Sequence, residues 1–145
     1  MIGARAGVVE DASAAHPSYR ANHVARDTAP ASARHGVACT LRAWGLEHLA
    51  DTAELLVSEL VTNAVTHTGS RTIGVAVTRP VETTVRIMVL DTDRTEMPPP
   101  AAPGADEESG RGLVLVGALS DRWGVERVTT GKRVWCELNV KKVRP

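Results

Sequence analysis

The sequence predicts an α+β fold: a two-layer α/β sandwich in which helices cover one face of a mixed, mostly antiparallel sheet. Three observations predict it. Apolar residues recur at helical spacing before residue 70, and their period changes to two from residue 72 onward. The predicted strands come in pairs and do not alternate strictly with helices. The length of 145 residues suits one domain with a real core.

The first half of the chain predicts a tail, a strand and two helices. Residues 1–18 are small and polar without a period, so we expect a flexible N-terminal tail before a single domain over 19–145. Residues 19–26 suit a short edge strand. A helix follows from Pro30, capped by Asp27 or Thr28 and stopped by Gly45.

The second helix is the strongest in the chain and runs for about twenty residues up to Gly69. Apolar residues off its main stripe indicate burial on more than one side. The stripe comprises Leu49, Ala53, Leu56, Leu60, Ala64 and His67, and Leu55, Val61 and Val65 lie off it.

The second half predicts four strands and one short helix. Residues 72–79 and 83–90 form two strands, and the second ends in Asp91. Residues 91–110 form a long proline-rich loop, which in a compact domain is either functional or disordered. A glycine turn then opens a short helix, and two strands follow at about 122–128 and 133–140.

Composition excludes several classes of protein. The formal net charge is zero, from 17 basic and 17 acidic residues, which argues against nucleic-acid binding. No apolar run is long enough to span a membrane, and the N-terminus lacks the apolar core of a secretory signal, so we expect a cytoplasmic protein. Cys39 and Cys136 are too few for a disulfide framework and lack zinc-site spacing, so we expect two buried thiols.

Three patches can carry chemistry. Glu59 and Asn63 stand four apart on the long helix and point the same way, which suits a base and a metal ligand but also a solvated helix face. Asp91 can accept from an exocyclic amine or simply close a turn. Gly110-Arg111-Gly112-Leu113 can cradle an anion at a helix start, or form an ordinary turn. Neither a Rossmann GxGxxG motif nor a P-loop is present.

Taken in order, these patches resemble the GHKL, or Bergerat-fold, ATP-binding family. The stretch ELLVSELVTNAVTHT is similar to the N-box of the small bacterial anti-sigma-factor kinase-like branch, and RWGV and GKRVW are similar to its last strands. The resemblance covers about residues 19–140 and implies ATP and Mg²⁺ as cofactors.

The resemblance also implies a role for each matching residue. Glu59 would be the catalytic base, Asn63 would ligate Mg²⁺, and Asp91 would bind the adenine amine. Residues 94–110 would form the ATP lid. His67 would lie near the nucleotide, although a half-buried structural histidine is the alternative. The full set expected at the nucleotide is Asn63, His67, Asp91, Asp93, Gly110, Arg111, Gly112 and Leu113.

Two departures from the family pattern concern nucleotide affinity. The usual Asp-x-Gly-x-Gly loop is replaced, so that Asp93 brings a charge and a side chain where backbone normally approaches the base. The family's threonine near adenine corresponds to Arg133, and Thr129 or Thr130 are candidate substitutes.

The leading expectation is an anti-sigma-factor type serine/threonine kinase that phosphorylates an antagonist protein. A contact regulator of a sigma factor without phosphotransfer is the rival, and a histidine-kinase fragment is a third reading. The resemblance implies a sigma factor or its antagonist as partner, no direct nucleic-acid or membrane partner, and a homodimer.

Overall fold

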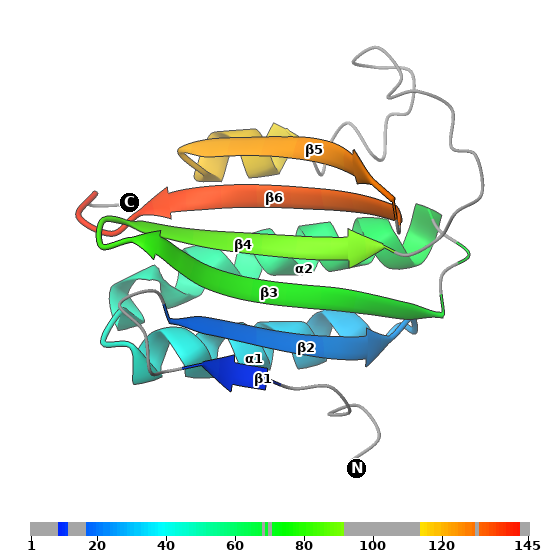
Figure 1. Ribbon diagram of the computed structural model, residues 1–145, viewed down its shortest axis with the longest axis horizontal. Coiled ribbons are helices and arrows are strands. Elements are labelled where there is room, and N and C mark those ends of the chain that lie inside the picture. The colour runs from blue at the N-terminus through cyan, green and yellow to red at the C-terminus, as the bar shows by residue number, and fades with distance from the viewer. Residues whose placement is uncertain are drawn as a thin grey trace.

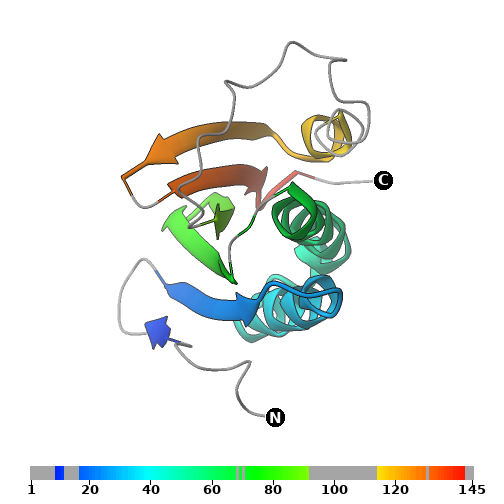
Figure 2. The same cartoon turned by 90° about the vertical axis from the view of Figure 1, so that its right-hand side faces the viewer.

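A computed structural model describes residues 9–11, 17–67, 69, 71–91, 114–129 and 131–142. Six strands form one sheet in the order β1-β2-β3-β4-β6-β5, and all five strand pairings are antiparallel. Helices α1 and α2 lie side by side against one face of this sheet (Figures 1 and 2). The two-layer α+β prediction is confirmed, with an entirely antiparallel sheet among the described strands.

The elements follow the predicted order closely. The strands are β1 (Val9–Asp11), β2 (Ser18–Val24), β3 (Thr72–Val81), β4 (Thr84–Asp91), β5 (Arg122–Val128) and β6 (Gly131–Asn139). The helices are α1 (Ala29–Ala43), the 3₁₀ turn η2 (Glu47–Leu49) and α2 (Ala50–His67), with a further short helix over residues 114–119. None of the helices described is long and apolar enough to cross a membrane.

The N-terminal region differs from the prediction in one respect. Residues Val9–Asp11 lie inside the stretch we expected to be a tail, yet they pair with β2. Strand β2 is therefore not an edge strand, because β1 pairs with one side of it and β3 with the other. A three-residue strand is too short to show a period of two, so the pattern could not reveal it.

Helix α1 ends as its sequence predicts. Gly45 has φ +75°, a left-handed conformation that glycine adopts without steric cost. Its N–H donates to the carbonyl of Arg42, and Leu46 N–H donates to Leu41 O at 2.7 Å, which together form a Schellman motif. At the other end Thr28 is the N-cap residue, but its side chain makes no cap hydrogen bond, so only the position of this cap was correct.

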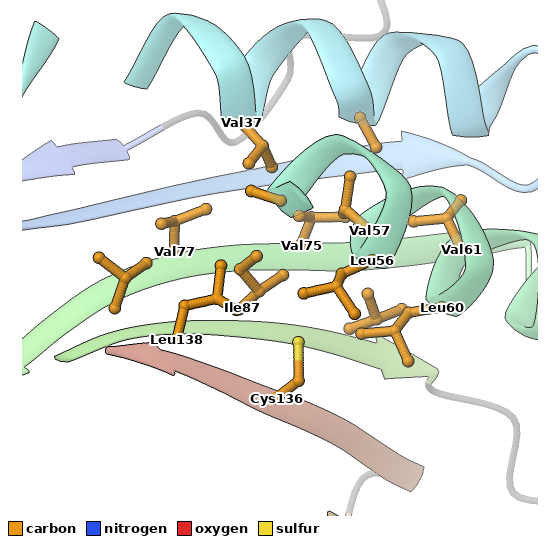
Figure 3. Close-up of a cluster of buried hydrophobic side chains, with 14 of the residues drawn as sticks. Val37, Leu56, Val57, Leu60, Val61, Val75, Val77, Ile87, Cys136 and Leu138 are labelled. Carbon is orange, nitrogen blue, oxygen red and sulfur yellow. The ribbon is translucent and has the colours of Figure 1, made fainter. Parts of the chain in front are cut away.

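The core lies between the helices and the sheet (Figure 3). Alternate residues of β3, β4 and β6 point to the helices, as the period of two requires. Both helices contribute apolar stripes, although Leu55 of α2 is 52% exposed. The largest fully buried side chains include Val37, Leu41, Leu56, Val57, Val61, Val75, Val77, Ile87 and Leu138.

The other face of the sheet has no helix on it in the part of the chain that is described (Figure 2). Residues that alternate with the core positions point to this face, and the register pairs Arg86 with Glu137 and Met88 with Trp135. We call it the open face, meaning the side of β2 to β6 opposite α1 and α2.

Candidate functional site

Helix α2 holds the first predicted pair of site residues. Leu56 and Leu60 are buried in the core, which fixes how the helix is rotated about its axis. Glu59 and Asn63 stand one turn apart on α2, and both are half-buried. The two oxygen-bearing side chains therefore lie at the margin between core and solvent, where a base and a metal ligand can reach a bound molecule.

Asp91 lies at the end of the molecule where the C-terminus of α2 is found. It is the last residue of β4, only 3% exposed, and it pairs with Ile73 of β3. Helix α2 ends at His67 and β4 ends at Asp91, and the C-terminal ends of these two elements lie at the same end of the molecule (Figure 1). The structure thus brings a buried carboxylate to the end of α2 that carries Asn63 and His67.

The sheet register shows which residue of β6 lies beside Asp91. Asp91 pairs with Lys132, whereas Arg133 pairs with Leu90 on the open face. Directly paired residues in an antiparallel sheet share a face. Lys132, and not Arg133, therefore stands beside Asp91 on the helix side. Alternation from the apolar residues Cys136 and Leu138 gives Lys132 the same parity, so the sequence did contain this signal.

A contact between the helices lies next to Glu59. The Arg34 guanidinium of α1 donates a hydrogen bond from Nη1 to Ser58 Oγ at 2.9 Å. Ser58 immediately precedes Glu59 on α2. This bond ties the two helices together where the proposed base is carried, and the sequence offers no pattern that would have revealed it.

His23 is a buried polar residue that the sequence analysis missed. It pairs with Ile73, which pairs in turn with Asp91, so the three lie in one row on the helix side of the sheet. His23 is 7% exposed and its Nδ1 atom has no hydrogen-bond partner. Burial lowers the pKa of its imidazole below the ordinary 6.5, so the neutral ring is favoured.

Several predicted site residues lie outside the described part of the chain. These are Asp93, Gly110, Arg111, Gly112 and Leu113, together with the lid over 94–110 and Thr130. The short helix at 114–119 follows this stretch directly, and its Val116 is buried in the core. The glycine segment therefore leads into a helix, as the sequence predicted.

The two cysteines differ in environment. Cys136 is fully buried, and burial together with the charge of Glu137 raises the pKa of its thiol to about 12. Cys39 is exposed on α1, with its Sγ 3.7 Å from His35 Nε2. The expectation of two buried thiols is therefore wrong for Cys39. No cluster of three or more His, Cys, Asp or Glu side chains that could hold a metal occurs among the described residues.

Two comparisons with known proteins concern the family of this chain. The family model for the histidine kinase-like ATPase domain matches residues 24–138. The chain is also 37% identical over 92 residues to a Streptomyces coelicolor protein named "Uncharacterized protein SCO4941", a match that covers 56% of this chain and 79% of the relative. The region matched by the family model includes α1, α2, β3, β4, β5 and β6 up to Leu138, and with them Glu59, Asn63 and Asp91. The chain belongs to the histidine kinase-like ATPase domain family.

Proposed function

We propose that this protein is an ATP-dependent serine/threonine kinase of the anti-sigma-factor type. Membership of the family implies that the chain binds ATP. The observation that carries the finer proposal is the pairing of Glu59 and Asn63, one turn apart on α2 and half-buried, on a helix that leads to the buried Asp91.

The residues present fit the two cofactors. Asp91 offers a buried carboxylate that can accept a hydrogen bond from the exocyclic amine of adenine. Asn63 offers a neutral amide oxygen, a ligand type that Mg²⁺ accepts when phosphates and water supply the rest of its octahedron. A site of this kind needs no cluster of carboxylates from the protein.

The chemistry proposed for this chain is positioning and proton removal. ATP supplies the phosphoryl group and Mg²⁺ offsets phosphate charge. The Glu59 carboxylate accepts the proton of a serine or threonine hydroxyl as that oxygen bonds to phosphorus and the bond from phosphorus to the ADP oxygen breaks. Arg34 helps to hold this part of α2 in place through Ser58.

The proposed partners follow from the same reading. The phosphorylated hydroxyl would belong to a small antagonist protein, and a sigma factor would be the regulated partner. We propose a cytoplasmic location and a homodimer as part of the same function.

Calorimetric titration of Mg·ATP is the first test. Asn63→Ala should weaken magnesium-dependent binding at least about tenfold, because the amide is the proposed protein ligand of the metal. Thr62→Ala is the matched control, since Thr62 is an exposed neighbour on α2, and it should bind within about twofold of wild type. Equal binding by both variants and wild type would refute the role of Asn63.

Phosphotransfer tests the role of Glu59 separately. Glu59→Ala should keep Mg·ATP binding but lose about a hundredfold or more in the rate of label transfer from γ-labelled ATP to an antagonist. An unchanged rate would show that Glu59 is not the base.

A contact regulator without phosphotransfer is the second candidate. The register favours it, because Lys132 stands beside Asp91 and can compete with the adenine amine for the carboxylate. Absence of binding at millimolar ATP, with recovery in Lys132→Thr, would support this candidate.

A further inference from the structure

The open face carries a side-chain cluster that the nucleotide site does not use. It consists of Arg86 on β4, Trp135 and Glu137 on β6, and Arg122 on β5, and we call it the Arg–Trp cluster. The register places these residues on one side of three adjacent strands, opposite α1 and α2.

Glu137 is the buried centre of this cluster. It is 5% exposed, although it lies on the open face and not between the sheet and the helices. Its Oε2 accepts hydrogen bonds from Arg86 Nε at 2.8 Å and Nη2 at 2.5 Å, and its Oε1 lies 3.4 Å from Arg122 Nη1. The only negative charge of the cluster is therefore covered by its own two cations.

The cations remain accessible while the carboxylate does not. The side chains of Arg86 and Arg122 are 37% and 71% exposed. A guanidinium has five N–H donors, so most of those on Arg122 are not used by Glu137. The cluster presents positive charge outward and hides its negative charge, although the whole chain has a net charge of zero.

Trp135 orients the two arginines. The guanidinium carbons of Arg86 and Arg122 lie 5.5 and 5.6 Å from the centre of its ring, which is cation–π distance. The ring also lies over Gly124, where an added Cβ would come within 2.8 Å of Trp135 Cζ2. The arginines are thus held in place before any partner arrives, which lowers the entropic cost of binding.

The neighbouring charges on the open face do not cancel this positive charge. Arg133 pairs with Glu126 at 2.5 Å, so this pair is neutral, and Arg20 of β2 is exposed on the same face. Tryptophan and arginine are the residue types that dominate protein–protein binding energy. Charge complementarity then favours an acidic partner.

We infer that the Arg–Trp cluster is a docking site for an acidic segment of a partner protein, in which carboxylates pair with Arg122 and Arg86 and an adjoining apolar group packs on Trp135. This site lies on the opposite side of the sheet from Glu59 and Asn63 and works without nucleotide.

Fluorescence anisotropy with a short fluorescein-labelled peptide of Glu and Ala tests this inference. The full chain should bind this peptide, should bind a Gln and Ala peptide at least about tenfold more weakly, and should lose affinity as NaCl is raised. Arg122→Ser should weaken binding at least about fivefold. The matched control is Arg42→Ser on α1, because Arg42 is also an exposed arginine paired with one glutamate, and it should change binding less than about twofold.

Two further variants separate peptide docking from a folding defect and from the proposed kinase activity. Arg122→Lys retains the charge and should recover most of the affinity, which separates docking from a folding defect. Asn63→Ala should bind the peptide as well as wild type does, so a failure of the proposed kinase activity would not affect this result.

Three outcomes would overturn the inference. One is equal binding of the Glu and Gln peptides, and another is equal weakening by Arg122→Ser and Arg42→Ser. The third is that another occupant takes the face: a single-stranded oligonucleotide that binds more tightly than the peptide, or a homodimer, seen in sedimentation velocity, that Arg122→Ser dissociates.

Discussion

The two faces of strand β6 bury their residues by different means. Cys136 and Leu138 point to the helices and are enclosed by apolar side chains. Trp135 and Glu137 point to the open face, where two arginines pair with the buried Glu137. One strand therefore shows that a sheet can bury a carboxylate on a face that none of the described helices covers, provided that cations pair with it.

Truncating a side chain of β6 that points to the core should lower stability more than a substitution on the open face. Leu138→Ala should lower the free energy of unfolding by about 2–5 kcal/mol, since Leu138 is fully buried and its removal leaves a cavity. Urea denaturation measures this. Val81→Ala, at a 52% exposed position, should change stability by less than about 0.5 kcal/mol. Similar losses in both variants would mean that Leu138 does not pack in the core.

The contribution of the open face to stability should depend on the charge of Glu137. Glu137→Gln should cost about 1–2 kcal/mol, because it weakens bonds to two arginines that are themselves partly exposed. Thermal unfolding followed by circular dichroism measures this. The exposed pair of Glu126 and Arg133 provides the control, and Glu126→Gln should cost only about 0.2–1 kcal/mol. A larger loss for Glu126→Gln would reverse the comparison.

Packing of Trp135 on Gly124 sharpens the same comparison. Gly124→Ala should cost about 1 kcal/mol, at the low end of overpacking, because Trp135 lies on the open face and can shift outward. The cost should vanish in a Trp135→Leu background, where the contact is absent. Urea midpoints of the two single variants and the double variant test this. If the loss of stability persists in the double variant, it arises from the backbone of β5 and not from the contact with Trp135.

His23 on the core side should make stability depend on pH. Its pKa is lowered in the folded state, so below pH 6.5 the unfolded chain binds a proton that the folded chain resists. The free energy of unfolding should therefore fall as the pH drops from 6.5 towards the lowered pKa that His23 has in the folded state. His23→Gln should lose less stability than wild type between about pH 7.5 and about pH 5.5. Parallel losses would show that His23 is not the titrating group.

The sequence predicted the layers well because they depend on periodicity. Helix α2 and strands β3 and β4 carry long apolar periods, and their bounds lie close to those expected. The register between paired strands was harder to predict than the layers. The sequence analysis did not identify Lys132 as the neighbour of Asp91, because similarity of short motifs does not fix register and a slip of one residue moves a side chain to the other face.

Side-chain partners were the least predictable features. No pattern in the sequence singles out Glu137, and only the folded sheet brings Arg86, 51 positions away along the chain, against it. The same holds for Arg34 and Ser58, which join two helices. Cys39 was expected to be buried because cysteine usually is, yet it lies on the outer side of α1.

Because one cysteine is exposed and the other is buried, the rate of thiol alkylation can measure how often the sheet separates from the helices. In the folded protein a thiol-specific alkylating reagent should modify Cys39 at once, since that thiol is exposed. Cys136 has no solvent contact and a pKa of about 12, so it should react only after β6 separates from the helices. The rate at which a second label is taken up would then report how often the core opens, without any substitution in the chain.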